Sequence, residues 1–324
     1  MLQTSSLLQA AAEAAAGQHH PTGALYVVAT PIGNIADITL RALHVLAMVD
    51  AIACEDTRHS ASLLRRLGIE KPLFPLHEHN ERVASAAVLE RLARGERVAY
   101  VSDAGTPAIS DPGAELVAAV RAAGYRAVPI PGPSSVVAAL SVSGDVQGSD
   151  FTFAGFLPTR GRDREAALER LAASPVRTVL FEAPHRILAL ADALARHCGD
   201  RPVTVCRELT KQFETVTTLG AHELPRWFAA DETRLRGEFV VVLHAAASTI
   251  AAATSTLALD SASETALRTL LGALPLKQAV ALAADLTHAP RNRLYARALQ
   301  LRREIGEVNV PPIAATQTKR TDGA

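Results

Sequence analysis

Residues 97–130 read RVAYVSDAGTPAISDPGAELVAAVRAAGYRAVPI, and this stretch decides the fold class. A short apolar run is followed by a loop rich in Gly and Pro, by a segment with helical apolar spacing and by a second apolar run. This order predicts a strand, a loop, a helix and another strand. The same alternation starts upstream at LYVVAT, residues 25–30. Because near-continuous apolar strands separated by helices are typical of parallel sheets covered on both faces, we predict a mainly parallel α/β domain over residues 24–143.

The second half of the chain predicts another α/β domain with a different kind of sheet. Apolar runs recur as FTFAGF, TVLFEA, VTVCREL, ETVTTL and GEFVVVLH. VTVCREL and ETVTTL are separated by little more than KQF, which is too short for the crossover that a parallel pair needs. We therefore predict antiparallel pairing here and a separate mixed α/β domain over residues 144–245.

The remaining segments have simpler compositions. Residues 1–23 are rich in Ala, Gln and Ser and are predicted to be a flexible extension, and residues 246–263 read as a linker. Residues 264–306 predict a small domain of three helices that resembles a helix-turn-helix module, and residues 307–324 predict a flexible tail. Between residues 264 and 303, seven Lys and Arg residues stand against two acidic ones, so any nucleic-acid patch is expected there.

Composition narrows the class of protein. The 324 residues are 48% hydrophobic and 20% charged, which is typical of a globular chain, and 33 basic residues balance 33 acidic ones. Cys54, Cys198 and Cys206 show no CxxC spacing, which argues against a disulfide framework or a zinc site. The first Lys or Arg is Arg41, and no apolar stretch reaches membrane-spanning length. We therefore expect a cytoplasmic protein without a membrane segment.

Three loops are candidates for a binding site because each follows an apolar strand. They are TPIGN at residues 30–34, SDAGTPAISDPG at residues 102–113 and PGPSS at residues 131–135. Ligands of open α/β sheets bind beyond the carboxyl ends of the strands, so these loops can converge on one pocket, although each alone could be a connecting turn. The chain contains neither GxGxxG after the first strand nor GxxxxGK[ST], which makes dinucleotide and phosphate-loop sites weak alternatives.

Several motifs occur in an order that resembles a known family. They are ATPIGNIADITLRAL, ACEDTRHS, LHEHNE, VSDAGTPAISDPG, PGPSS, FAGFLP, FEAPHR, CRELTK and GEFVVVL. This set resembles the RsmI family, the bacterial 16S rRNA cytidine 2′-O-methyltransferases of the tetrapyrrole-methylase fold. The resemblance spans residues 25–243, and the basic helical segment is similar to that family's small C-terminal domain. It implies two α/β domains with S-adenosylmethionine in the cleft between them, a homodimer, and methylation of a cytidine ribose in the decoding region of 16S rRNA of the small ribosomal subunit.

The resemblance also implies which residues bind the cofactor. They are Pro31, Gly33, Asp103, Ala104, Gly105, Thr106, Ile109, Ser134, Ser135, Phe156, Phe181 and Glu182. The chemistry of these residues suits the ligand. A methionine moiety carries an ammonium and a carboxylate, which Asp103 and loop N–H groups can match, and apolar side chains suit an adenine ring.

Methyl transfer from a sulfonium requires alignment and exclusion of water rather than a covalent residue or a metal ion. A ribose hydroxyl is a poor nucleophile, so a base near it can assist. The candidates are Glu55, Asp56, Glu182, Glu208 and Lys211. The sequence does not choose among them, and each could instead belong to a structural ion pair. LHEHNE at residues 76–81 lacks the HExxH spacing, so we predict no metal site.

Basic residues in three regions are candidates for RNA contacts. The candidates are Arg58, Arg160, Arg162, Arg291, Arg293 and Arg297. Alternatives stay open, since Arg58 can pair with Asp56 and the others can simply be solvated. Two other functions also stay open, namely methylation of a tetrapyrrole or other small molecule and a helix-turn-helix regulator with an α/β sensing domain. The basic helical segment favours an RNA substrate over a small one.

Overall fold

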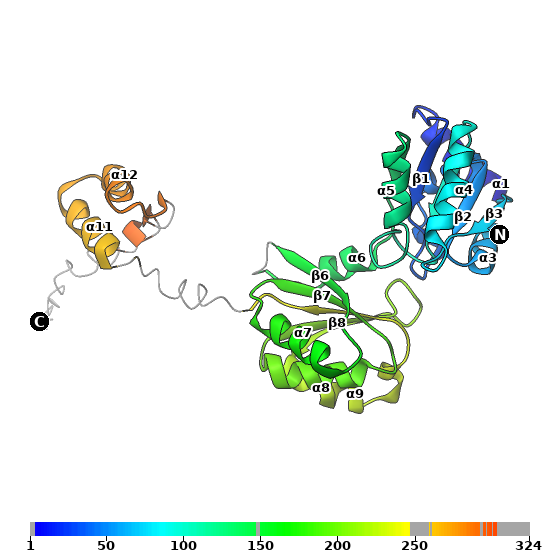
Figure 1. Cartoon of the computed structure of the whole chain (residues 1–324). Helices are drawn as coiled ribbons and strands as arrows, with labels where there is room; N and C mark the ends of the chain where they lie inside the picture. Colours follow the sequence, from blue (N-terminus) through cyan, green and yellow to red (C-terminus); the bar gives the residue numbers. More distant parts are fainter. Residues whose placement is uncertain are drawn as a thin grey trace, which may run out of the picture. The chain divides into compact units, whose positions relative to one another are not determined.

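A computed structural model describes residues 4–146, 150–246, 259, 261–291, 294–295, 297–299 and 301–302. The chain divides into two compact units, Met1–Ala246 and Ala247–Ala324. The first unit contains two sheets with their covering helices, and the second contains helices (Figure 1). The predicted α/β class, with one mainly parallel sheet, one mixed sheet and a helical C-terminal region, is confirmed.

The first sheet is parallel throughout and has the strand order β3-β2-β4-β1-β5. Its strands are β1 (Ala24–Val28), β2 (Ala51–Cys54), β3 (Leu73–Pro75), β4 (Arg97–Val101) and β5 (Arg126–Ile130). The apolar strands bury side chains on both faces, because helices cover each face. All five carboxyl ends therefore meet at one edge, where the three candidate loops begin.

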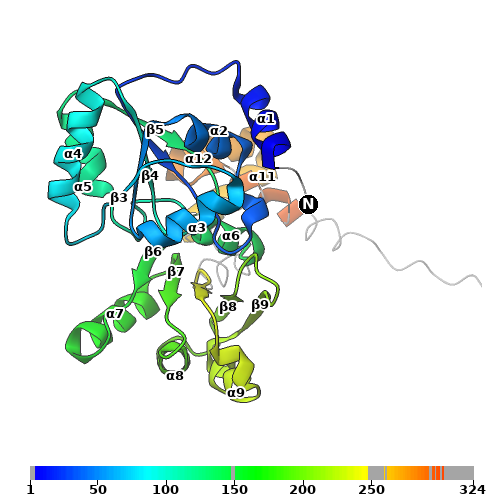
Figure 2. The same ribbon diagram turned by 90° about the vertical axis from the view of Figure 1, so that its right-hand side faces the viewer.

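Five helices form the two outer layers of this region (Figure 2). They are α1 (Thr4–Ala15), α2 (Leu40–Met48) and α3 (Thr57–Leu67) on one face, and α4 (Glu81–Ala93) and α5 (Ala114–Ala122) on the other. Side chains cap the N-termini of two of these helices by accepting hydrogen bonds from free backbone N–H groups. Thr39 Oγ1 accepts a hydrogen bond from Ala42 N at the start of α2, and Asp56 Oδ1 accepts one from Arg58 N at the start of α3.

The prediction of a flexible extension over residues 1–23 is wrong for most of that segment. Helix α1 packs beside α2, and Ala11 is buried in the first sheet's core, with Leu7 and Leu8 packed against it. Small alanine side chains allow two helices to approach closely, so an Ala-rich face can be a packing face. The chain after α1 is also fixed, because Tyr26 donates a hydrogen bond to Pro21 O at 2.7 Å.

The second sheet is mixed and has the strand order β6-β7-β10-β8-β9. Its strands are β6 (Phe151–Phe156), β7 (Arg177–Glu182), β8 (Pro202–Arg207), β9 (Thr215–Gly220) and β10 (Phe239–Leu243). Only β6 and β7 pair in parallel, and β8 and β9 form the antiparallel pair that the sequence predicts. One face packs on α7 (Gly161–Ala173), α8 (Ile187–Cys198) and α9 (Leu224–Ala229).

The predicted boundary at residue 143 does not divide the first unit into two separately packed parts. Helix α6 (Ser135–Val142) belongs to the first half of the chain, but Val136 and Ala139 pack against the second sheet. They contact Val179 and Val240, whose strands supply the open face of that sheet. The helix therefore joins the loop after β5 directly to the second sheet.

In the second unit, helices α11 (Ser261–Ala273) and α12 (Leu276–Thr287) pack together, and the described residues between 291 and 302 are helical. Their shared core includes Leu267, Ala283 and Leu294. Helix α11 starts three residues before the predicted domain boundary, within the predicted linker. Residues 247–258 and 303–324 lie outside the described chain. None of the described helices combines the length and apolar character needed to cross a bilayer.

Candidate cofactor site

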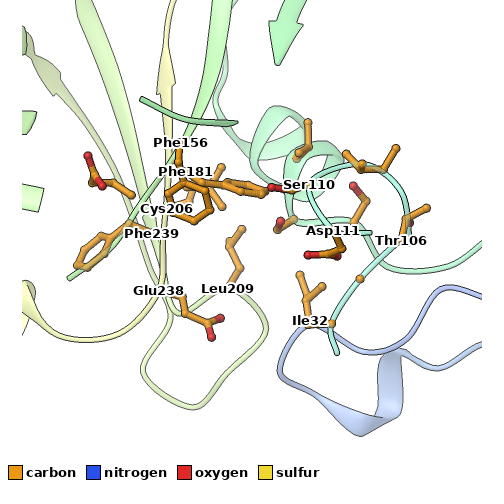
Figure 3. Close-up of a pocket in the computed structure, with 18 of the residues that line it drawn as sticks. Ile32, Thr106, Ser110, Asp111, Phe156, Phe181, Cys206, Leu209, Glu238 and Phe239 are labelled. Carbon is orange, nitrogen blue, oxygen red and sulfur yellow. The ribbon is translucent and has the colours of Figure 1, made fainter. Parts of the chain in front are cut away.

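A cavity of about 400 Å³ lies between the loops of the first sheet and the strand ends of the second sheet (Figure 3). Loops after β1, β4 and β5 supply one wall, and the ends of β6, β7, β8 and β10 supply the other. All three loops predicted to converge on a pocket therefore reach this cavity. Its volume lies within the range of small-molecule sites.

Hydrogen bonds fix the three loops against one another. Thr30 and Gly105 exchange backbone hydrogen bonds of 2.9 and 3.1 Å, which joins the first loop to the second. Thr106 Oγ1 donates to Pro133 O at 3.0 Å, which joins the second loop to the third. Gly105 has a φ of 78°, in the left-handed region where a side chain is strained. The three loops therefore form one connected wall, held together by their own hydrogen bonds.

The opposite wall is mainly apolar and aromatic. The Phe156 and Phe181 ring centroids lie 5.6 Å apart at an angle of 66°, and the Phe153 ring lies 5.0 Å from Phe181. Phe156 is exposed at the cavity even though it is a large apolar side chain. Cys206 also lines this wall, and burial raises the pKa of its thiol to about 12, so it stays protonated. This wall offers apolar surface for a flat ring rather than a nucleophile.

Glu182 is the charged group buried in the aromatic wall. Its side chain lines the cavity and has no exposed surface. Oε1 pairs with Arg186 Nε at 2.9 Å and accepts a hydrogen bond from Ala183 N at 3.0 Å. Oε2 has only Arg164 Nη1 at 3.9 Å, without a hydrogen bond. A buried acceptor without a donor is costly, so this oxygen is suited to a donor on a ligand.

Most residues predicted to bind the cofactor line this cavity. They are Ala104, Gly105, Thr106, Ile109, Ser134, Ser135, Phe156, Phe181 and Glu182. Pro31, Gly33 and Asp103 are not among the lining residues, whereas their neighbour Ile32 is. Gly33 instead lies against the loop after β8, where an added Cβ would meet Lys211 Cγ at 2.5 Å. The close approach of these two loops, rather than contact with a ligand, explains why a residue without a side chain stands at position 33.

Asp103 has a partner that differs from the predicted cofactor ammonium. Its Oδ1 accepts a hydrogen bond from Asp56 N at 3.1 Å, and its own backbone N–H bonds to the Glu55 carboxyl. These contacts join the loops after β2 and β4. Burial raises the pKa of Glu55, and the charges of Asp103 and Asp111 raise it further. Glu55 is not among the residues that line the cavity.

The other candidate bases are held in ion pairs. Hydrogen bonds from the Arg58 side chain and backbone lower the pKa of Asp56 to about 2. Burial alone would raise the pKa of Glu208, but hydrogen bonds from Lys211 and from the Glu238 backbone lower it. Burial alone would lower the pKa of Lys211, but its contacts with Glu208 at 2.8 Å and Glu238 at 3.0 Å raise it. None of the three is suited to accept a proton.

Sequence reasoning missed several lining residues. They are Ile32, Ser110, Asp111, Val136, Ala183, Pro184, Cys206, Leu209, Glu238, Phe239 and Val240. Most flank a motif that the sequence already singles out, so motif position was the available signal. Asp111 lies inside SDAGTPAISDPG, and position on the loop alone does not distinguish it from Asp103. Among the described residues, no group of three or more His, Cys, Asp or Glu side chains is placed to hold a metal ion.

The arginines predicted to contact RNA differ in their surroundings. Arg58, Arg160 and Arg162 are exposed, although Arg58 pairs with Asp56 at 2.9 Å. Arg291 is also exposed and pairs with Asp285 at 3.2 Å. Arg293 lies outside the described residues.

Arg297 does not fit the prediction of a free arginine on the helical unit. Its side chain is only 17% exposed, and Nε and Nη2 both bond to Glu264. This fork joins the last helical segment to α11, and Glu264 also accepts from Arg268 Nε at 3.0 Å. The arginine therefore has a packing role, because its charge is already satisfied inside the unit.

Replacing Arg297 by alanine is expected to destabilise the helical unit by about 1–2 kcal/mol, because it removes the bidentate ion pair with Glu264. Hydrogen exchange of α11 amides in the full-length chain measures this effect. Arg291→Ala is the matched control. Its pair with Asp285 is exposed on both sides and is expected to contribute less than about 0.5 kcal/mol. Equal protection of α11 in both variants would contradict the packing role of Arg297.

Comparison with known proteins gives a consistent set of relatives. The family model for Tetrapyrrole (Corrin/Porphyrin) Methylases matches residues 24–225, and the model for the RsmI C-terminal HTH domain matches residues 258–302. Ribosomal RNA small subunit methyltransferase I of Pseudomonas aeruginosa is 46% identical over 86% of this chain and 97% of that protein. The protein of the same name from Escherichia coli O157:H7 is 44% identical over 86% of this chain and 95% of its own length.

A solved structure agrees with the fold. The X-ray structure of a cobalamin biosynthetic enzyme, cobalt precorrin-4 methyltransferase, matches with a TM-score of 0.52. The match is 19% identical in sequence and covers 69% of this chain and 98% of that chain. At this identity the likeness concerns the arrangement of the two sheets and not the substrate.

Proposed function

Because this chain belongs to the tetrapyrrole methylase family, and within it to the ribosomal RNA small subunit methyltransferase I proteins, we propose that it methylates the 2′-hydroxyl of a cytidine in the decoding region of 16S rRNA. The chain is an S-adenosylmethionine-dependent methyltransferase that acts on small-subunit rRNA. The ribose position and the cytidine are the finer parts of the proposal. They rest on the resemblance of the motifs around the cavity.

The cavity between the two sheets is the observation that carries the cofactor assignment. One wall is aromatic and suits an adenine ring, and the other is loop backbone and hydroxyl side chains that suit a methionine tail. The unpartnered Glu182 Oε2 offers an acceptor to an amino or hydroxyl group of the adenosine. Volume, polarity and the free acceptor therefore all fit S-adenosylmethionine.

The residues of the chain have alignment and water exclusion as their main tasks. S-adenosylmethionine supplies a methyl group already activated by its positive sulfur, so no covalent residue is required. Phe156 and Phe181 shield the adenosine side from water, while the fixed loop around Gly105 sets where the methionine side lies. Holding the attacking oxygen in line with the methyl carbon lowers the activation free energy of such a displacement substantially.

Exposed basic side chains occur at the start of α7 and in the helical unit. Arg160 and Arg162 follow Phe156 in the chain by a few residues and begin α7 without ion pairs among the described residues. We infer that they contact RNA phosphates, with Arg58 and Arg291 as further contacts and Arg293 as a sequence-based candidate. The family resemblance further supports a homodimer and a cytoplasmic location, where small ribosomal subunits are assembled.

Labelled methyl transfer tests this function. The protein is incubated with S-adenosylmethionine that carries a labelled methyl group, together with small ribosomal subunits from cells lacking the corresponding enzyme. Large subunits and uroporphyrinogen serve as controls, because the fold is shared with enzymes of small substrates. Incorporation into small-subunit RNA alone is expected. Incorporation only into the tetrapyrrole, or into both subunits equally, would contradict the proposed substrate.

A further inference from the structure

Three carboxyl groups line the cavity, and only one lacks a basic partner among the described residues. Glu182 pairs with Arg186, and Glu238 pairs with Lys211 through a carboxylate that is otherwise exposed. Asp111 lines the same cavity on the loop wall and forms no ion pair with a described Lys, Arg or His. Figure 3 shows its carboxyl beside Ser110 on the loop wall, across from the aromatic side chains.

The loop around Asp111 is held in place from several sides. Tyr100 donates a hydrogen bond from its hydroxyl to Pro112 O at 2.8 Å. Glu81 Oε1 accepts from Gly113 N at 2.9 Å and from Leu116 N at 3.0 Å, which anchors the start of α5. A side chain at Gly113 would meet the Tyr100 ring, so the loop backbone packs directly against that ring. Asp111 is therefore presented from rigid backbone.

The surroundings of Asp111 raise the pKa of its carboxyl. Burial raises the pKa of its carboxyl, a hydrogen bond from Ser102 lowers it in part, and the charge of Asp103 raises it again. Glu55 directly follows β2, and the charges of Asp103 and Asp111 both contribute to the raised pKa of the Glu55 carboxyl. The structure thus keeps a half-buried carboxyl without a cation next to it, which favours uptake of a proton.

We propose that Asp111 is the general base that takes the proton from the acceptor hydroxyl during methyl transfer. This inference rests on the proposed function and names the residue that performs one of its steps. Glu182 and Glu238 line the cavity but are held by Arg186 and Lys211, and Glu55 lies outside it. The earlier candidates Asp56, Glu208 and Lys211 are held in ion pairs of their own.

The step balances without another reactant. The hydroxyl O–H bond breaks and its proton moves to an Asp111 carboxylate oxygen, while the same oxygen atom of the acceptor forms a bond to the methyl carbon. The bond between that carbon and sulfur breaks, and its electron pair remains on sulfur as a neutral thioether. Asp111 then releases the proton to water.

Asp111→Asn tests this role, because asparagine keeps the shape but accepts no proton. We expect the single-turnover rate of methyl transfer to small subunits to fall by about 100-fold or more at neutral pH. Calorimetric affinity for S-adenosylhomocysteine is expected to stay within about threefold of the wild type, since a base for the acceptor does not hold the cofactor. Glu115→Gln removes an exposed carboxylate four residues away and is the matched control, with an expected rate equal to the wild type.

A second readout follows from the surroundings of Asp111. Because its pKa is raised in the folded protein, the charged carboxyl opposes folding at pH values above that pKa and has no such effect at acid pH, where the group is protonated in both states. Asp111→Asn is therefore expected to raise the melting temperature at neutral pH and to leave it unchanged at acid pH. A stable variant with a slow reaction separates a lost base from a lost fold.

Three outcomes would overturn the assignment. An unchanged transfer rate in Asp111→Asn, with the wild type active, would show that Asp111 takes no proton. A loss of S-adenosylhomocysteine affinity as large as the loss of rate would make Asp111 a cofactor ligand instead. A wild type that transfers no methyl group to small subunits would overturn the proposed function itself and this role with it.

Discussion

Replacing Gly105 by valine is expected to weaken S-adenosylmethionine binding by about 100-fold or more, which corresponds to about 2.7 kcal/mol. The backbone at this position has a φ of 78°, where a β-branched residue is strongly disfavoured. An added Cβ would lie 3.3 Å from Ile32 Cγ2, at the wall of the cavity. Relief of that strain would also break the paired hydrogen bonds between Thr30 and Gly105. Isothermal calorimetry with S-adenosylmethionine measures the loss.

Gly124→Val is the matched control for backbone strain. Gly124 has a φ of 83°, but nothing lies within 4 Å of an added Cβ, and it follows α5 away from the lining residues. This variant is expected to lose stability and to bind the cofactor normally. If Gly105→Val bound S-adenosylmethionine as tightly as Gly124→Val does, the loop after β4 would not be part of the cofactor site.

Replacing Glu182 by alanine is expected to lower the free energy of unfolding by about 3–5 kcal/mol, as when one member of a buried ion pair is removed. Arg186 and Arg164 are only 19% and 13% exposed, and both lose their carboxylate. They also donate to Leu157 O and Pro158 O, so the loop before α7 loses its anchor. Denaturant unfolding followed by circular dichroism measures the change.

Glu165→Ala provides the comparison for Glu182. Glu165 pairs with His197 at 3.0 Å, but its side chain is 57% exposed, so the expected loss is below about 1 kcal/mol. Glu182→Gln keeps the side-chain shape, and its loss of unfolding free energy is expected to lie between those of Glu182→Ala and Glu165→Ala. Equal unfolding free energies for Glu182→Ala and Glu165→Ala would show that the buried pair contributes nothing to the fold.

Much of the architecture could be predicted because strands and loops carry local signals. The continuous apolar runs at β1, β2 and β4 indicate a covered parallel sheet, and the short connection between β8 and β9 indicates antiparallel pairing. Helix α1 escaped prediction because its packing face includes alanines, whose role depends on how closely α2 approaches. The packing of helix α6 on the second sheet could not be predicted, because the strands it contacts come later in the chain.

The candidate site was predictable at the level of loops but not of individual side chains. Motif order indicated nine of the twenty lining residues. It could not indicate side-chain partners, since Asp103 is separated by 47 positions from Asp56, its hydrogen-bond partner. Similarly, Glu238 meets Lys211 across 27 positions, and Arg297 meets Glu264 across 33. Only the folded chain shows which charges are already satisfied. The base candidates therefore changed, whereas the loops that form the site did not.

Alkaline hydrolysis of the labelled RNA product tests the central claim most directly. A methyl group on a ribose 2′-oxygen removes the nucleophile that cleaves the adjoining linkage, so the label is expected in an alkali-resistant dinucleotide. Digestion of that dinucleotide to nucleosides is expected to yield labelled 2′-O-methylcytidine from a single position of small-subunit RNA. Complete hydrolysis of the labelled product to mononucleotides would place the methyl group on a base and contradict the account.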